Sequence, residues 1–433
     1  MRHGESTSNV QGLVQGRGFL DEPERQSVLT EKGIAQAKAV GKALLPIPLQ
    51  RILVSPLQRA QHTAQIINSL RSTPLPLETA FNLCEISLPE WEGVSFEEIE
   101  RSSPDRYYCW HHTPHLLEMQ GKYPVLDLFA QAQAFWQELH SQYQGETILC
   151  VGHSGINRAL IATALGITPD RYHCLSQGNC CVSVVNWQAD GRAQLESANL
   201  TQHHGHILYP LRPGWTGPRI LLVRHGETQW NREQRFQGQI DVPLNANGKT
   251  QAEKTAAFLQ PIKIDRAFAS PLLRPKQTAE AILQGREVSL TLLDDLKEIS
   301  HGLWEGKLEA EIEQEFPGEL ERWQREPQNV QMPQGENLQQ VWERARRAWQ
   351  EIVATSQPGE TVLVVGHDAI NKAILCQLFD LKPDRFWAFK QGNGGISVID
   401  FREGKESAPV LTTSNITFHL SGSILDTTAK GAL

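Results

Sequence analysis

The chain has 433 residues, which is too long for one ordinary hydrophobic core and predicts two or three domains. Its 41 Lys and Arg residues are outnumbered by 49 Asp and Glu, and the basic residues form no cluster, which argues against nucleic acid as a partner. The seven cysteines are scattered without CxxC spacing, and no apolar stretch reaches the length of a membrane span. We therefore expect a soluble, cytoplasmic protein with no membrane partner and no structural zinc site.

Short apolar runs alternate along the chain with longer helical patterns. The strand-like runs are RILV (51–54), TILCV (147–151), CVSVV (181–185), ILLV (220–223) and TVLVV (361–365), and the clearest helical patterns are 35–45 and 340–353. This alternation is typical of α/β domains with a mostly parallel sheet. Because ligands bind beyond the carboxyl ends of parallel strands, we expect the polar residues that follow these runs to meet in one site per domain.

Five sequence blocks occur twice, in the same order. RHGESTSN (2–9) recurs as RHGETQWN (224–231), ILVSPLQRAQHTA (52–64) as AFASPLLRPKQTA (267–279), CEISLPEWEG (84–93) as KEISHGLWEG (297–306), ILCVGHSGIN (148–157) as VLVVGHDAIN (362–371), and LSQGNCCVSVV (175–185) as FKQGNGGISVI (389–399). The repetition predicts two tandem three-layer α/β/α domains, each with a mostly parallel sheet, at 1–209 and 219–420. A linker rich in Pro and Gly joins them at 210–218, and a tail follows at 421–433.

The repeated blocks bring two histidines, two arginines and one glutamate to each expected site. Guanidinium forks and imidazole donors can surround a dianionic phosphoryl group, and a neutral imidazole is a nucleophile toward phosphorus. Transfer through a phosphohistidine is therefore expected, with the glutamate protonating the leaving oxygen. A pocket wall such as Trp91 or Trp304 would help to raise the pKa of that carboxyl. This chemistry requires no metal and no other cofactor.

The blocks resemble the signatures of the histidine phosphatase superfamily, in its phosphoglycerate mutase-like branch. The resemblance extends over nearly the whole chain, twice, and the tandem layout is similar to that of two-domain plant members of the family. It implies that the phosphorylated nucleophiles and the proton donors are His3, Glu85, His225 and Glu298. It implies that the phosphate pocket and the polar positions lining it are Arg2, Asn9, Gln15, Arg59, His153, Arg224, Asn231, Gln237, Arg274 and His367.

An apolar run precedes the RHG block in the second copy, but only Met1 stands before it in the first. A sheet without this strand would lose several buried apolar side chains, each contributing about 1.5–3 kcal/mol. One hypothesis is that translation starts upstream, because Met1 aligns with Val223 and a GTG codon is read as methionine only at a start. The other is that the first copy is truly shortened, poorly ordered at its site and inactive. We favour the first, and a stop codon directly upstream would refute it.

The sequence thus predicts a phosphatase that acts on small phosphorylated metabolites, such as sugar or sugar-acid phosphates, without metal. One alternative is a phosphoglycerate mutase, which must exclude water from its phosphoenzyme. The spacings from Glu85 to His153 and from Glu298 to His367 are shorter than in mutases of the resembling family, where extra sequence between these residues helps to close the site. This difference favours hydrolysis. Another alternative is that the first copy is a binding module that regulates an active second copy.

Overall fold

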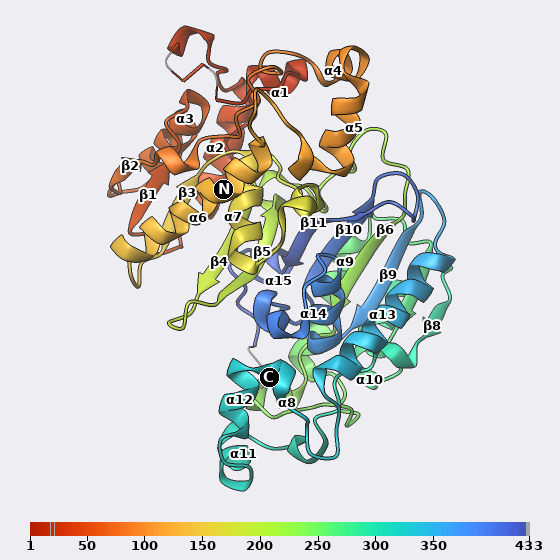
Figure 1. The fold of residues 1–433 in the computed structure, drawn as a ribbon. Coiled ribbons are helices and arrows are strands. Elements are labelled where there is room, and N and C mark those ends of the chain that lie inside the picture. The colour runs from red at the N-terminus through yellow and green to blue at the C-terminus, as the bar shows by residue number, and fades with distance from the viewer. Residues whose placement is uncertain (18, 21, 430–433) are drawn as a thin grey trace. The chain divides into compact units, whose positions relative to one another are not determined.

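The computed structural model describes residues 1–17, 19–20 and 22–429. The chain forms two compact units, whose elements are labelled in Figure 1. Unit 1 comprises Met1–Ser183 and Asn199–His206, and unit 2 comprises Val184–Ala198 and the chain from Ile207 onward. The segment Val184–Ala198 lies in the first copy of the sequence repeat but belongs to unit 2.

Unit 1 is built around a three-stranded parallel sheet of order β2-β1-β3. Its strands are β1 (Arg51–Val54), β2 (Leu77–Thr79) and β3 (Ile148–Val151). Its α-helices are α1 (Thr7–Gln11), α2 (Glu31–Ala43), α3 (Gln58–Ser69), α4 (Phe96–Ser102), α5 (Pro104–His112), α6 (Pro124–Gln142) and α7 (Ser154–Leu165). Short 3-10 helices are η1 (Pro23–Arg25), η2 (Phe81–Leu83), η3 (Pro114–Leu116), η4 (Pro169–Cys174) and η5 (Gln202–His204).

Unit 2 contributes to an eight-stranded sheet of order β4-β5-β11-β10-β6-β9-β7-β8. The strands of this sheet are β4 (Val182–Trp187), β5 (Ala193–Leu200), β6 (Arg219–Arg224), β7 (Arg266–Ala269), β8 (Leu290–Leu292), β9 (Thr361–Gly366), β10 (Ile396–Phe401) and β11 (Pro409–Ile416). The α-helices of unit 2 are α8 (Gln229–Glu233), α9 (Ala246–Leu259), α10 (Leu273–Leu283), α11 (Glu309–Glu315), α12 (Glu319–Arg325), α13 (Leu338–Thr355), α14 (Asp368–Gln377) and α15 (Phe418–Ser421). Short 3-10 helices are η6 (Asp294–Leu296), η7 (Gly302–Trp304), η8 (Pro327–Asn329) and η9 (Pro383–Ala388).

The strands that carry the repeated blocks lie at the centre of this larger sheet. β6 is buried along its whole length, pairs in parallel with β9 and in antiparallel with β10, and β9 pairs in parallel with β7. Helix α9 packs on α10 and helix α13 on α14. Helices α9 and α13 each begin at an asparagine cap, Asn245 and Asn337, whose side chain accepts a backbone N–H. The α/β fold expected from the alternating pattern is confirmed.

The two RHG blocks are held in the same backbone register. Arg224 ends β6 and pairs with Gly366, the last residue of β9, and Arg2 forms the equivalent parallel bridge with Gly152, directly after β3. The backbone N–H of His3 donates to the carbonyl of Gly152 at 3.0 Å. The strand ends therefore position both copies of the histidine alike.

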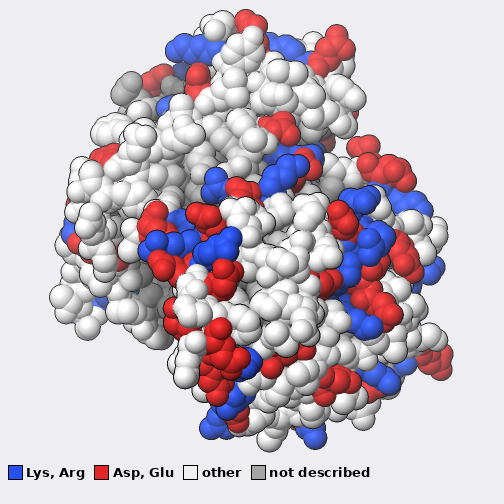
Figure 2. Space-filling view, turned by 60° about the horizontal axis from the view of Figure 1, so that its bottom comes forward, with Lys and Arg blue, Asp and Glu red and all other residues white. Residues whose placement is uncertain are grey.

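The surface in Figure 2 mixes basic and acidic side chains on the face in view, rather than separating them by sign. Within the described part of the chain, every helix is too short or too polar to cross a lipid bilayer.

Candidate active sites

His225 lies directly after strand β6 in a buried position. Its Nδ1 is 2.6 Å from the carbonyl oxygen of Gly226. Because a carbonyl oxygen only accepts, Nδ1 carries the proton and Nε2 keeps its lone pair. Burial, reinforced by Arg274 and Arg224, lowers the pKa of His225 well below its usual value of 6.5. The ring is therefore neutral at pH 7 and suited to nucleophilic attack.

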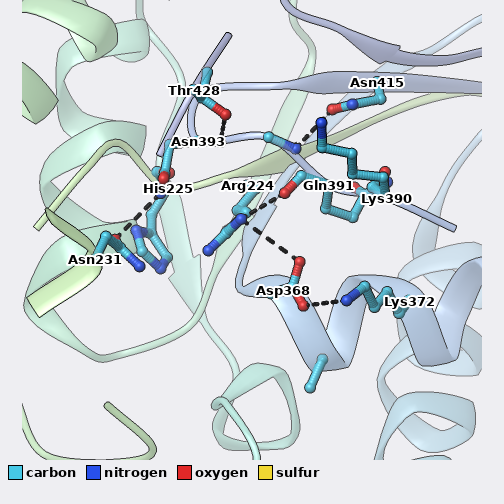
Figure 3. Close-up of polar contacts among 12 residues, drawn as sticks. Arg224, His225, Asn231, Asp368, Lys372, Lys390, Gln391, Asn393, Asn415 and Thr428 are labelled. Carbon is cyan, nitrogen blue, oxygen red and sulfur yellow. Dashed lines mark hydrogen bonds and ion pairs between the residues drawn. The ribbon is translucent and has the colours of Figure 1, made fainter. Parts of the chain in front are cut away.

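Two buried arginines flank this histidine. Arg274 is fixed by two carbonyl oxygens, since its Nη1 donates to Ile240 at 3.0 Å and its Nη2 to Gly238 at 2.7 Å. Arg224 donates through Nη1 to the carbonyl of Gln391 (Figure 3). Among the described residues, the buried Nε groups of both arginines have no hydrogen-bond acceptor. Buried donors without an acceptor are costly, so this arrangement suits an anionic group that receives them.

His367 is the second histidine of this site. It caps the start of α14, and its ring centroid lies 5.1 Å from that of His225. Its Nε2 is 2.9 Å from the hydroxyl of Ser270, which fixes the ring. Burial and Arg274 lower the pKa of His367 well below 6.5, so this imidazole also enters the site neutral.

Glu298 lies at the N-terminus of α14, where its carboxylate accepts the backbone N–H of Ala369 at 3.1 Å. It also accepts the N–H of Ile299 at 3.0 Å. Burial raises the pKa of Glu298, and the neighbouring carboxylate of Asp368 raises it further, against the opposing charge of Arg274. A carboxyl group in this setting is suited to donate a proton near neutral pH.

Asp368 is a charged residue of the second site that the sequence did not single out. Its Oδ1 is 3.6 Å from Nη1 of Arg224, and its Oδ2 is 2.6 Å from Nζ of Lys372 (Figure 3). The ammonium group of Lys372 also faces the ring of Trp387 at 4.7 Å. The first copy has Ser154 and Arg158 at the two corresponding positions.

The first site repeats the same arrangement on unit 1. His3 is buried, and its Nδ1 lies 2.7 Å from the carbonyl oxygen of Gly4, so its Nε2 also keeps the lone pair. Its ring centroid is 5.0 Å from that of His153, whose Nε2 is 2.8 Å from the hydroxyl of Ser55. Burial, with the charge of Arg59 next in size, lowers the pKa of both histidines well below 6.5.

The charged partners of the first site differ in detail from those of the second. Nε of Arg59 donates to Nε2 of His3 at 3.2 Å, and Nη1 of Arg2 donates to the carbonyl of Gln177 at 2.8 Å. Glu85 accepts the N–H groups of Gly155 at 3.0 Å and of Ile86 at 2.8 Å, so it lies at the start of α7 as Glu298 lies at the start of α14.

Four further polar residues predicted for the phosphate pocket brace the loop behind each histidine. Asn231 accepts the N–H of Thr228 at 3.1 Å, and the hydroxyl of Thr228 donates to Gln237 at 2.9 Å. In unit 1, Asn9 and Gln15 make the corresponding contacts with Ser6, each at 3.1 Å. Asn9 and Asn231 also accept the side-chain amides of Asn179 and Asn393, at 3.1 and 3.3 Å, so they join this loop to the QGN block.

Two pairs of site residues were overlooked among the repeated blocks. Ser55 and Ser270 orient the second histidine of each site, and Asn179 and Asn393 donate to the backbone carbonyl of the first. Each pair occupies equivalent positions in the SPL and QGN blocks. Their recurrence at equivalent positions of the repeated blocks is the signal that indicates them.

Comparison with known proteins gives matches over both copies. The profile of the histidine phosphatase superfamily (branch 1) matches residues 1–201 and 220–414. A 2-carboxy-D-arabinitol-1-phosphatase of Triticum aestivum is 30% identical over 433 residues, covering 97% of this chain and 86% of the relative. Phosphoserine phosphatase 1 of Hydrogenobacter thermophilus is 35% identical over 202 residues, covering 47% of this chain and 94% of the relative.

A further relative carries a different name. The probable phosphoglycerate mutase GpmB of Salmonella arizonae is 31% identical over 214 residues, covering 48% of this chain and 97% of the relative. The profile match and the full-length relative agree with the paired geometry of the two sites. The chain belongs to the histidine phosphatase superfamily (branch 1), with the family's domain present twice.

Proposed function

We propose that this protein is a phosphatase that releases phosphate from small phosphorylated metabolites through a phosphohistidine. We assign one site to each of the domains at 1–209 and 219–420, with His3 and His225 as nucleophiles. The observation that carries the proposal is the state of His225, a buried neutral ring whose Nε2 keeps its lone pair beside two arginines. The same arrangement at His3 supports activity in the first domain.

In the first step, Nε2 of His225 attacks the phosphorus atom. A P–N bond forms while the P–O bond to the leaving group breaks, and protonated Glu298 gives its proton to the leaving oxygen. Arg224, Arg274 and His367 meet the charge on the phosphoryl oxygens from fixed positions. In the second step, the Glu298 carboxylate takes a proton from water, the water oxygen attacks phosphorus, and the P–N bond breaks to release phosphate and restore the neutral ring.

The proposed substrate class is supported by the relative that covers 97% of the chain. That protein is named for the hydrolysis of 2-carboxy-D-arabinitol 1-phosphate, a sugar-acid monophosphate. We propose sugar-acid and sugar monophosphates as substrates, with 2-carboxy-D-arabinitol 1-phosphate as the first compound to test.

Mutase activity is a second candidate, because a relative of similar identity over half the chain is named a probable phosphoglycerate mutase. A mutase would use the same histidine and return the phosphoryl group to a second hydroxyl. The two reactions differ only in the fate of the phosphohistidine, and water access to it decides between them.

The test is phosphate release by the purified chain in the presence of a chelator, across 2-carboxy-D-arabinitol 1-phosphate, phosphoserine, sugar phosphates and 3-phosphoglycerate. We expect release from at least one sugar-acid or sugar phosphate, together with acid-labile labelling of the wild-type chain that is absent in the double variant His3→Ala/His225→Ala. Conversion of 3-phosphoglycerate to its 2-isomer without phosphate release would instead establish the mutase. Absence of both reactions and of labelling would reject the phosphohistidine mechanism.

A further inference from the structure

A segment of β5 runs along the loop that follows η9 in unit 2. Leu195 bridges to Phe389, and the carbonyl of Leu195 accepts the N–H of Lys390 at 2.9 Å. The side chain of Gln194 donates to the carbonyl of Trp387 at 3.0 Å. These β5 residues come from the first copy of the sequence repeat, yet they are part of unit 2.

Glu196 forms the charged centre of this contact and is only 7% exposed. Its Oε2 is 3.2 Å from Nζ of Lys390, and its Oε1 accepts the N–H of Asp426 at 3.0 Å. Its backbone carbonyl accepts the side-chain amide of Asn415 at 2.9 Å. Nζ of Lys390 is also 3.4 Å from Asp426. The carboxylate thus holds Lys390 and the N–H of Asp426 in one geometry, and removing it leaves Lys390 with Asp426 as its remaining ion-pair partner.

The loop that Glu196 holds is the one that surrounds the second nucleophile. The backbone carbonyl of Gln391 accepts a hydrogen bond from Nη1 of Arg224, and Gly392 donates its N–H to the side chain of Asn415 at 2.8 Å. The next residue, Asn393, donates its side-chain amide to the carbonyl of His225 at 3.2 Å (Figure 3). The carboxylate of Glu196 thus acts on the loop through Lys390, whereas the contact with Asn415 is made by the backbone carbonyl of Glu196.

The ion pair of Glu196 with Lys390, here called the brace, is specific to the second site. By alignment of the repeats, the counterpart of Glu196 is Thr412 and the counterpart of Lys390 is Ser176. Thr412 donates its hydroxyl to Asp400 at 2.7 Å. The ion pair between Glu196 and Lys390 therefore has no counterpart at the equivalent positions of the other copy.

We propose that Glu196, supplied by the first sequence copy, is a positioning residue for the second active site. The proposal rests on the proposed function, in which His225 is the nucleophile. Glu196 touches neither the substrate nor the reacting atoms, and it acts by fixing the Lys390–Asn393 loop that orients Arg224 and His225. Displacement of a catalytic group lowers kcat more than it lowers substrate affinity. The reason is that the atoms that react need closer alignment than the atoms that only bind the substrate.

The test uses the full chain with His3→Ala, so that phosphate release reports the second site alone. We expect Glu196→Gln to lower kcat by about threefold and Glu196→Ala by about tenfold, with KM changed less than about twofold. Lys390→Met should give a similar loss, and the double variant Glu196→Ala/Lys390→Met should lose no more than either single variant. Asp190→Ala is the matched control, because Asp190 is a carboxylate of the same hairpin that pairs with Arg192 at 2.7 Å.

Unchanged kcat in Glu196→Ala and Glu196→Gln, or losses that add in full in the double variant, would overturn the proposal. Should Glu196→Ala fail to fold, Glu196→Gln, which keeps the side-chain volume, provides the same comparison. Absence of turnover in both the wild type and His3→Ala would contradict the proposed function instead. In that case the affinity for orthovanadate tests the brace without turnover, and Glu196→Gln should weaken it severalfold while Asp190→Ala leaves it unchanged.

Discussion

The carboxylate of Asp368 lies 3.6 Å from the guanidinium of Arg224 in the second site, whereas Ser154 stands at the corresponding position in the first. Asp368 directly precedes Ala369, whose N–H is bound by Glu298. A second carboxylate therefore stands beside the proposed proton donor in one copy of the repeat only. Since like charges oppose each other's ionisation, Asp368 raises the pKa of Glu298.

We expect Asp368→Asn to move the alkaline limb of kcat/KM to lower pH when the first site is silenced by His3→Ala. Glu298 must carry a proton to donate it, and Asp368 is one of the two causes that raise its pKa. Without that charge, Glu298 loses its proton at lower pH and phosphorylation of His225 slows there. The measurement is the pH profile of phosphate release at low substrate concentration.

The control for this shift of the alkaline limb is the variant that introduces a carboxylate at the corresponding position of the first site. Ser154→Asp, made in a chain silenced at the second site by His225→Ala, should move the alkaline limb to higher pH. A profile of Asp368→Asn that keeps its alkaline limb in place would mean that Glu298 does not set it.

We expect the stability of the chain to fall as the pH falls below about 6.5. The four histidines of the two sites have pKa values held well below 6.5 by burial, so the folded state resists protonation that the unfolded chain accepts. Above 6.5 both states are neutral at these positions and no penalty arises, whereas below it the unfolded state binds more protons and the free energy of unfolding decreases. Thermal unfolding midpoints at pH 7.5 and 5.5 measure the effect, and His367→Asn should reduce the difference between them.

We expect both sites to turn over substrate, so that His3→Ala and His225→Ala each retain part of the phosphate release and the double variant retains none. The reason is that each site has a buried neutral histidine whose Nε2 carries no proton, and a second histidine whose ring centroid lies about 5 Å away. Loss of all turnover in His225→Ala, with phosphate binding to the first domain preserved, would instead make the first copy a regulatory module.

The repeated blocks predict that the two histidines and two arginines of each copy lie near the ends of neighbouring strands. His225 follows β6, Ser270 follows β7 and His367 follows β9, and the carboxyl ends of these parallel strands lie at one edge of the sheet. The apolar runs therefore predict that these residues lie close together, because each motif residue closely follows a strand-like run in the sequence.

The charged residues that distinguish the two copies could not be predicted in the same way. Asp368 and Lys372 are four residues apart on α14, a spacing that is also common for ion pairs on exposed helix faces. The membership of Val184–Ala198 in unit 2 depends on pairing between β5 and β11, which has no local sequence signal. Such features depend on tertiary contacts between segments far apart in the chain.

We expect Gly238→Ala to lower kcat/KM at the second site by about tenfold or more, because its carbonyl holds Nη2 of Arg274 and an exact guanidinium position is needed for the phosphoryl group. The glycine has a φ of +54°, and a Cβ there would lie 2.0 Å from the carboxylate of Glu305, so either the turn or the Glu305 side chain must shift. Gly285→Ala is the matched control, since Gly285 has a φ of +76° but open space at its Cβ. Gly285→Ala should lose about 1 kcal/mol of stability from backbone strain alone, whereas Gly238→Ala should lose more because of the added clash, and only Gly238→Ala should lose activity. Equal activity in the two variants, measured by phosphate release with His3→Ala, would show that the Gly238 turn does not position Arg274.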